Sequence, residues 1–361
     1  MRALSCQRDK FSETNHKPMG ELTLEDVARL AGVHRSTVSR VVNDSPNVSP
    51  EVRKRVQKII QSTGYHPNAA ARSLASQRSN VIGLVLPRSV SSFFTDPFFP
   101  HLTQGIAFGC NNNTLTLSLV LAGSKEDEEE ILPRISRRGL LDGILIQSGR
   151  PDETMIERLI KSNIPSVIIG RPFASDGISY IDIDNVNAAI KATKHLIDLG
   201  YQKIAAITGN LDSTVTEDRI IGYKQALVAA NRTIDDKLIA EGDFTEISGY
   251  LAMKRLLPGK PDAIFAMSDM MAAGAIRAIQ EAGLNVPQDI AIIGFDDVPI
   301  ARQSKVQLST IKQPISRFGI KAVELLIDLI ENGTKPARRI ILDTELVIRE
   351  SCGTKILKEH S

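Results

Sequence analysis

The chain has 361 residues, of which 42% are hydrophobic and 24% are charged, a composition typical of a globular protein rather than a disordered one. The longest apolar runs are too short to span a bilayer, and the polar first twenty residues lack the apolar core of a secretory signal. Three widely separated cysteines, Cys6, Cys110 and Cys352, argue against a disulfide framework. We therefore expect a cytoplasmic protein of two or three domains.

Charge is distributed unequally along the chain, although the net charge is only +2. Residues 1–80 carry 13 Lys and Arg against 7 Asp and Glu, whereas the remainder carries 31 against 35. A basic N-terminal segment on a mildly acidic body indicates contact with a polyanion. A solvated basic face would give the same count, so charge alone does not decide.

Two short helices separated by a turn are predicted near the N-terminus. Thr23 followed by Asp26 is a capping-box variant that starts a helix, and this helix should end at about Ala31. Gly32 suits the positive φ of a tight turn. A second helix follows over roughly 35–43.

A third helix is predicted from Ser49 as its N-cap and Pro50 at its first position to Gly64 at its end. Apolar residues repeat at helical spacing through all three helices and supply one small core: Val27, Ala31, Val33, Val38, Val41, Val52, Val56, Ile59 and Ile60. This pattern is typical of a helix-turn-helix, whose second helix is presented outward.

The second helix leaves a set of polar side chains outside the core. Such side chains can hydrogen-bond base edges or phosphates in a major groove; they are Arg35, Ser36, Thr37, Ser39 and Arg40. Many structural helical hairpins share the pattern, so this feature by itself leaves a purely structural role open.

The segment 23–43 resembles the head of the lactose-repressor (LacI/GalR) family, and the segments 65–68 and 71–74 resemble its hinge. The resemblance extends from Leu22 to Gly353. It adds further expected DNA contacts, namely Thr23, Asn43, Tyr65, Asn68 and Leu74. His34 departs from the family pattern, which usually has Ser there, and Ser is the better helix cap.

Residues 68–76 are rich in helix formers but too few for a stable isolated helix, and composition alone favours a plain linker. The resemblance implies instead a hinge that folds on DNA, pairs with its dimer mate and inserts Leu74 into the minor groove. Such an apolar wedge kinks the duplex.

From Val81 onward, short apolar runs alternate with helical stretches. The expected parallel strands are Val81–Leu86, Leu115–Leu121, Gly143–Ile146, Val167–Ile169, Lys203–Thr208, Ala263–Met267 and Ala291–Gly294. The expected helices lie near 100–112, 126–138, 152–162, 186–199, 216–230, 246–257 and 270–282. The alternation predicts a doubly wound α/β body.

The expected fold is thus a small all-α helix-turn-helix head plus a two-lobed α/β body. The resemblance implies periplasmic-binding-protein-like lobes with parallel sheets, and chain crossings near residues 182, 312 and 342. The expected division is an extension (1–20), the DNA-binding domain (21–66), the hinge (67–80), the effector-binding and dimerisation body (81–353) and a tail (354–361).

Ligands of doubly wound folds bind at the carboxyl ends of the strands. Residues there that match the family's effector pocket are Phe99, Gln147, Arg171, Arg219, Phe244, Ser268, Asp269 and Asp296. Aromatic faces, carboxylates and an Arg suit a neutral polyol. Ordinary loop polars and core aromatics are the alternative for any single residue.

The resemblance implies a homodimeric repressor that binds a pseudo-palindromic operator under the control of a small molecule. A sugar inducer is the leading expectation, and a purine or other corepressor is the alternative. No nucleotide, metalloprotease or nucleophile-elbow motif is present in the sequence, so we expect no catalysis, cofactor or metal. A transport binding protein would need a secretory signal and no DNA head.

Overall fold

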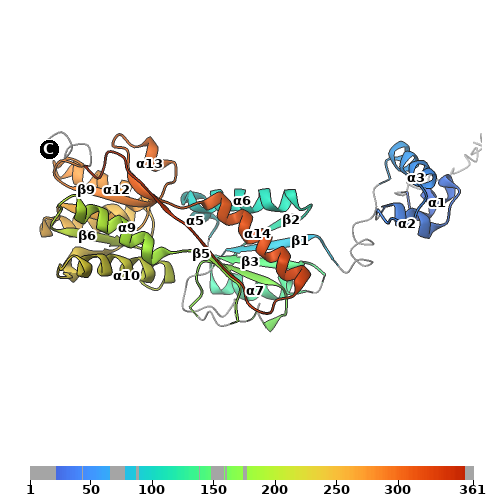
Figure 1. Ribbon diagram of the computed structural model, residues 1–361, viewed down its shortest axis with the longest axis horizontal. Coiled ribbons are helices and arrows are strands. Elements are labelled where there is room, and N and C mark those ends of the chain that lie inside the picture. The colour runs from blue at the N-terminus through green and yellow to red at the C-terminus, as the bar shows by residue number, and fades with distance from the viewer. Residues whose placement is uncertain are drawn as a thin grey trace, which may run out of the picture. The chain divides into compact units, whose positions relative to one another are not determined.

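The computed structural model describes residues 22–42, 44–65, 78–86, 89–137, 139–147, 158, 161–173 and 177–353. The chain divides into two compact units, residues 1–78 and 79–361. We call them the head and the body and describe each by itself (Figure 1). No helix in these described ranges is long and apolar enough to cross a membrane.

The head contains the three predicted helices, α1 (Leu24–Ala31), α2 (Arg35–Val42) and α3 (Pro50–Thr63). The predicted capping box is confirmed. The Thr23 hydroxyl accepts from the Asp26 N–H at 3.3 Å, and the Thr23 N–H donates to the Asp26 carboxylate at 3.0 Å. Gly32 ends α1 at a φ of 61°, the left-handed conformation that glycine adopts without strain.

One apolar core holds the three head helices together. Its buried members are Val27, Ala28, Ala31, Val38, Val41, Val56 and Tyr65. The Arg53 guanidinium on α3 bonds the Asp44 carboxylate and the Ser45 carbonyl, which ties α3 to the turn after α2. The geometry of the two-helix unit therefore depends on α3 as well.

His34 performs the capping function expected of the Ser that it replaces. Its carbonyl accepts the first bonds of α2, from Thr37 N–H at 2.9 Å and Val38 N–H at 3.3 Å. Its ring Nδ1 lies 3.3 Å from the Ser36 N–H, which donates to it, and 2.9 Å from the Ser36 hydroxyl. An imidazole nitrogen thus satisfies one of the unpaired donors at the start of α2.

The body has two lobes, each built on a six-stranded sheet with helices on both faces (Figure 1). The first sheet has the order β11-β5-β4-β3-β1-β2 and is parallel throughout. Its strands are β1 (Val81–Leu86), β2 (Thr116–Leu121), β3 (Gly143–Gln147), β4 (Ser166–Ile169), β5 (Tyr180–Ile183) and β11 (Arg339–Leu342). Its helices are α5 (Val90–Thr95), α6 (Phe98–Asn112), α7 (Lys125–Ile135) and α14 (Ile315–Asn332).

The second sheet has the order β12-β10-β9-β8-β6-β7, and only its edge strand β12 is antiparallel to its neighbour. Its strands are β6 (Ile204–Thr208), β7 (Ile239–Glu241), β8 (Ala263–Ala266), β9 (Ala291–Asp296), β10 (Ser309–Lys312) and β12 (Glu345–Val347). Its helices are α9 (Asn185–Asp198), α10 (Thr214–Ala229), α11 (Glu246–Leu256), α12 (Asp269–Glu281) and α13 (Ile300–Gln303), with 3₁₀ turns at Asp236–Leu238 and Leu257–Gly259.

The chain crosses between the lobes three times. It passes from β5 to α9, from β10 to α14 and from β11 to β12, and the three connections run close together in Figure 1. The crossings expected near residues 182, 312 and 342 are therefore confirmed. Each lobe consequently contains elements from distant parts of the sequence.

The seven strands expected in the body are confirmed with small shifts at their ends, as are six of the seven helices. The helix expected at 152–162 lies almost entirely outside the described residues. The sequence reading missed β5, β7, β10, β11 and β12, which have only three or four residues each, and the long helix α14.

Helices α6 and α14 pack unusually closely in the first lobe because each contributes a glycine to the crossing. A Cβ added at Gly105 would lie 2.2 Å from the Ser316 carbonyl oxygen, and one at Gly319 would lie 2.6 Å from the Leu102 oxygen. The close approach fixes the first turns of both helices, where Phe99 and Phe318 lie, at the junction of the lobes.

The capping contact of His34 gives a testable expectation for the head. Replacing His34 with Ala should destabilise the head by about 0.5–2 kcal/mol, because α2 loses its side-chain cap. Replacing it with Ser should preserve stability, because a hydroxyl can accept the same N–H. Hydrogen exchange of the α2 amides in the full chain measures both, and equal exchange in wild type and His34→Ala would contradict the capping role.

Candidate functional site

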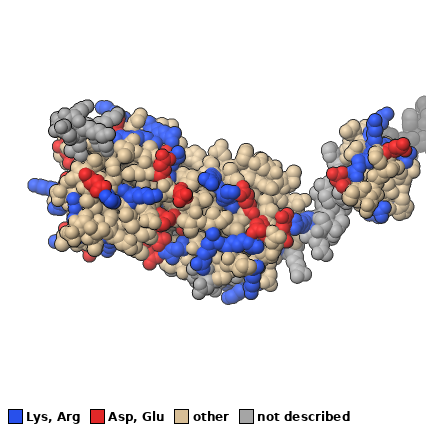
Figure 2. All heavy atoms as spheres, in the orientation of Figure 1, with Lys and Arg blue, Asp and Glu red and all other residues tan. Residues whose placement is uncertain are grey.

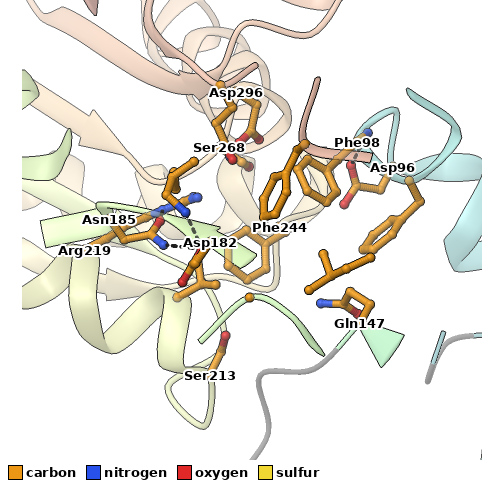
Figure 3. A pocket seen from close by; sticks show the side chains of 17 residues that line it. Asp96, Phe98, Gln147, Asp182, Asn185, Ser213, Arg219, Phe244, Ser268 and Asp296 are labelled. Atoms are coloured by element: carbon orange, nitrogen blue, oxygen red, sulfur yellow. Dashed lines mark hydrogen bonds between the residues drawn. The ribbon is translucent and has the colours of Figure 1, made fainter. Parts of the chain in front are cut away.

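A cavity of about 680 Å³, including its mouth, lies where the carboxyl ends of the two sheets meet. Side chains from both lobes surround it (Figure 3). The first lobe contributes Asp96, Phe98, Phe99, Gln147, Ile169, Gly170, Asp182, Ile183 and Phe318; the second lobe and its crossings contribute Asn185, Ser213, Val215, Arg219, Phe244, Ser268, Asp296 and Gln313. The position agrees with the general rule for open α/β sheets.

Arg219 is the cation of the cavity and is almost completely buried, with 4% of its surface exposed. Its Nε donates to Asn185 Oδ1 at 2.9 Å and its Nη1 to the Met267 carbonyl at 2.5 Å. The guanidinium lies 3.5 Å from the centre of the Phe295 ring. Burial lowers the pKa of Arg219 to about 10, against the opposing attraction of Asp296, so the group is cationic at neutral pH.

Asp296 ends β9 and brings the principal carboxylate to the cavity. Its Oδ1 accepts from Gln313 Nε2 at 2.6 Å, while Oδ2 receives no hydrogen bond from the described residues. Burial raises the pKa of Asp296 to about 7, and Arg219 opposes that rise. A carboxylate beside a guanidinium can accept from one hydroxyl of a ligand while the Arg donates to another oxygen.

Asp269 and Asp297 position the loop that presents Asp296. Asp269 is fully buried and accepts from the Val298 N–H at 2.9 Å and from the Thr310 hydroxyl at 2.6 Å. Asp297 pairs with Arg302 at 2.6 Å and Arg349 at 2.5 Å. The adjacent carboxylates Asp296 and Asp297 therefore face different partners and do not form the acid–base pair of a hydrolase.

Aromatic rings form apolar walls in both lobes. Phe244, between β7 and α11, has a φ of 70° and places its ring over Gly209, where an added Cβ would lie 2.0 Å from a ring carbon. In the first lobe, Phe98 and Phe99 pack edge to face with centroids 5.3 Å apart. Figure 3 shows Phe244 and Phe98 directed toward the same space, and such faces suit the apolar face of a sugar ring.

Six of the eight effector residues expected from the sequence line the cavity. They are Phe99, Gln147, Arg219, Phe244, Ser268 and Asp296. Ser268 also caps α12, where its hydroxyl accepts from the Met271 N–H at 3.2 Å. Arg171 and Asp269 lie outside the lining set: Arg171 forms ion pairs with Asp218 and Glu217, and Asp269 holds the loop described above.

Sequence reading missed several lining residues because it missed the strands that carry them. Asp182 lies in β5 and Asn185 begins the helix after it, whereas Gln313 follows β10 and Phe318 lies in the first turn of α14. The rule that located the other polar residues, a polar side chain at the carboxyl end of a strand, would have found Asp182, Asn185 and Gln313 once the strands were known, but not the apolar Phe318. Asp96, Ser213 and Val215 lie in loops or first helical turns and carried no such signal.

The predicted DNA-contact residues of the head are presented to different extents. Thr23, Arg35, Ser36 and Arg40 are exposed, and Thr37 and Ser39 are half-buried. Arg35 pairs with Glu25 at 3.0 Å, but both side chains are well exposed, so water and salt screen the pair.

Tyr65, another expected DNA contact, is 7% exposed and packs in the head core, and its contact with DNA stays a prediction. Its ring therefore stabilises the head. The expected contacts Asn43, Asn68 and Leu74 lie outside the described residues. On the face of the body drawn in Figure 2, Lys and Arg are interspersed with Asp and Glu.

No group of three His, Cys, Asp or Glu side chains within the described part of the chain is arranged to hold a metal ion. The polar groups of the cavity are instead donors and acceptors held by neighbouring residues. Their arrangement supports binding of a small polar molecule.

Two family models match the chain. Residues 23–68 match the model described as bacterial regulatory proteins, lacI family, and residues 193–352 match the periplasmic binding protein-like domain. The HTH-type transcriptional regulator CelR of Thermobifida fusca is 36% identical over 333 residues, which is 91% of this chain and 98% of that protein.

Solved structures are similar to this chain over nearly its whole length. The complex of transcriptional regulator CelR with cellobiose has a TM-score of 0.74 and 35% identity, covering 91% of this chain and 99% of the other. The lac repressor dimer bound to operator and the anti-inducer ONPF has a TM-score of 0.80 and 27% identity, covering 92% and 99%. Both regions of the chain thus have structural counterparts within single relatives.

The contact between Gly209 and Phe244 predicts a steric coupling in the cavity wall. Gly209→Ala should displace the Phe244 ring and lower the free energy of unfolding by about 1–3 kcal/mol, as overpacking does. In a Phe244→Ala background the ring is absent, so adding Gly209→Ala should cost less unfolding free energy than it does in the wild type. Chemical denaturation of the four proteins measures the coupling, and strictly additive effects would contradict it.

The raised pKa of Asp296 predicts a pH-dependent difference between wild type and Asp296→Asn. Because burial raises the folded-state pKa of Asp296 to about 7, above the ordinary aspartate value of 3.8, the stability that protonated Asp296 contributes is present below about pH 4. It is lost as the pH rises through 7. The variant should therefore gain stability relative to wild type between pH 4 and 7, with a slope of at most about 1.4 kcal/mol per pH unit. Denaturant titrations across that range would contradict the assignment if the difference stayed constant.

Proposed function

Because the chain belongs to the LacI family of bacterial regulatory proteins, we propose that it is a cytoplasmic, sequence-specific DNA-binding repressor whose operator affinity is controlled by a small neutral sugar. One observation carries the proposal. A single chain combines a helix-turn-helix head with a body whose polar and aromatic cavity is lined from both lobes.

DNA recognition is assigned to α2. Arg35 at its first position is exposed, and Arg is the commonest partner of guanine in the major groove. Thr23, Ser36, Thr37, Ser39 and Arg40 complete the proposed contact surface with base edges and phosphates. Since one recognition helix reads too few base pairs to be selective, the active species is a homodimer on a pseudo-palindromic operator.

A neutral sugar fits the chemistry of the cavity best. Arg219 and Asp296 offer a donor and an acceptor in the same cavity, and the rings of Phe98 and Phe244 can cover the apolar faces of a sugar. The cellobiose in the complex of the structural relative CelR supports this class of ligand. A purine corepressor is the competing outcome of the experiment below.

Control of DNA binding follows from the two-lobed cavity. A ligand that contacts Gln147 in the first lobe and Arg219 in the second stabilises one relative arrangement of the lobes. In a dimer, that arrangement would set the separation of the two segments that lead to the heads. Sugar binding and operator binding are then linked by a coupling free energy of about 1–3 kcal/mol.

Selection from a library of randomised palindromic DNA tests the proposal. The full chain should enrich one pseudo-palindrome, and a mobility shift with that DNA should be reversed by one member of a panel of neutral sugars. Enhancement by a purine would identify a corepressor instead, and the absence of any enriched DNA would contradict the proposed function.

The same selection tests the role of Arg35. Arg35→Ala should weaken operator binding by about 1–3 kcal/mol and relax specificity at one base pair of each half-site. Arg134→Ala removes the same charge from an exposed position on α7 in the body and should leave the selected sequence unchanged. Uniform weakening of all DNA variants by Arg35→Ala would make Arg35 a phosphate contact.

A further inference from the structure

Arg171 joins the two lobes beside the cavity rather than lining it. It follows β4 of the first lobe, whereas its acidic partners lie on α10 of the second lobe. Its Nε donates to Asp218 Oδ2 at 3.0 Å and its Nη2 to Asp218 Oδ1 at 2.7 Å, which is a two-point contact with one carboxylate. Nη2 also donates to Glu217 at 3.1 Å.

The Arg171 backbone is held from both lobes as well. Its N–H donates to Asp182 Oδ2 at 2.9 Å, and its carbonyl accepts from the Thr214 hydroxyl at 2.8 Å. Asp182 belongs to the first lobe and lines the cavity, and Thr214 lies between Ser213 and Val215, which line it from the second lobe. Any separation of the lobes at this wall must therefore break the Thr214 bond and both ion pairs.

These contacts are shielded enough to matter energetically. The side chains of Arg171 and Asp218 are 31% and 14% exposed, whereas that of Glu217 is 52% exposed. A two-point guanidinium–carboxylate contact is among the stronger side-chain interactions, and partial burial reduces its screening by salt. The pair with Asp218 is thus the main contact, and the pair with Glu217 is secondary.

We propose that Arg171 is a positioning residue that holds the two lobes closed over the cavity through Asp218 and Thr214 without touching the ligand. The proposal rests on the proposed function, since it assigns a control element to the same effector site. It also replaces the expectation that Arg171 binds the effector directly.

The consequence for binding is a shift between open and closed bodies. A ligand that contacts both lobes binds the closed form more tightly than the open form. Contacts that favour closure in the absence of ligand therefore raise the fraction of the protein that is competent to bind. Loss of the Arg171 contacts should then weaken ligand binding about three- to tenfold, although no ligand contact is removed.

The distance between the lobes tests the proposal without any ligand. Spin labels are attached at Leu140→Cys in the first lobe and Val228→Cys in the second, both of which are exposed positions. Cys6 is replaced by Ser so that it is not labelled. An excess of unlabelled chain ensures that the measured distances lie within one chain rather than between two. Pulsed electron–electron double resonance should give a narrow distribution of label-to-label distances for the parent protein. Arg171→Ala and Asp218→Asn should each broaden this distance distribution and shift it to longer distances.

Exchanging the charges of Arg171 and Asp218 distinguishes a specific contact between the lobes from general destabilisation of the body. Arg171→Asp combined with Asp218→Arg should recover much of the narrow distribution that either single variant loses. Arg277→Ala is the matched control, because it breaks an ion pair of 2.9 Å with Glu246 inside the second lobe and should leave the distance unchanged. A distribution in Arg171→Ala identical to that of the parent would overturn the proposal.

A binding measurement distinguishes failure of this inference from failure of the proposed function. Cellobiose and ribose serve as probes in calorimetry with the parent and with Arg171→Ala. If neither sugar binds and no DNA is selected, the proposed function fails, while the distance measurement still decides the role of Arg171. If a sugar binds both proteins equally and the distances agree, the role of Arg171 fails and the proposed function stands.

Discussion

The arrangement of the cavity depends on one buried cation. Removing an ion from water costs several kcal/mol unless its neighbours compensate, and Arg219 is compensated by the Asn185 amide, the Met267 carbonyl, the Phe295 ring and the nearby Asp296 carboxylate. Asn185 in turn donates to Asp182 at 3.3 Å, so the cation in the second lobe is connected to the first. These requirements fix the side chains around Arg219 before any ligand arrives, which is the pre-organisation that selective binding needs.

The three chain crossings explain how such a site can act at a distance. Because β5, β10 and β11 each lead directly from one lobe to the other, the lobes can rotate about these connections but cannot separate. The cavity and the Arg171 contacts lie at that junction. Under the proposed function, a small molecule bound there would change the relative orientation of the lobes rather than the fold of either one, as hinge-type transitions do.

Sequence reasoning located the parts with strong local signals. The capping pair Thr23 and Asp26 and the turn at Gly32 define the head, and strand ends gave six lining residues. It missed β5 and β10 because four-residue strands carry little periodicity, and with them Asp182 and Gln313. The roles of Arg171 and Asp269 could not be read from position, since each follows a strand as a ligand contact would. Only the structure shows that their partners are protein groups, and α14 was legible in the spacing of Phe318, Ala322, Leu325 and Leu329 yet overlooked.

Under the proposed function, occupation of the cavity and binding of DNA by the head are one linked equilibrium. The most direct test is the affinity of the identified sugar, measured by calorimetry with the full chain alone and with the chain saturated by its selected operator. The two affinities should differ, and their ratio should equal the factor by which saturating sugar changes operator affinity, because linkage is reciprocal. Equal sugar affinities in the two titrations, for a sugar whose binding is abolished by Phe244→Ala, would contradict it.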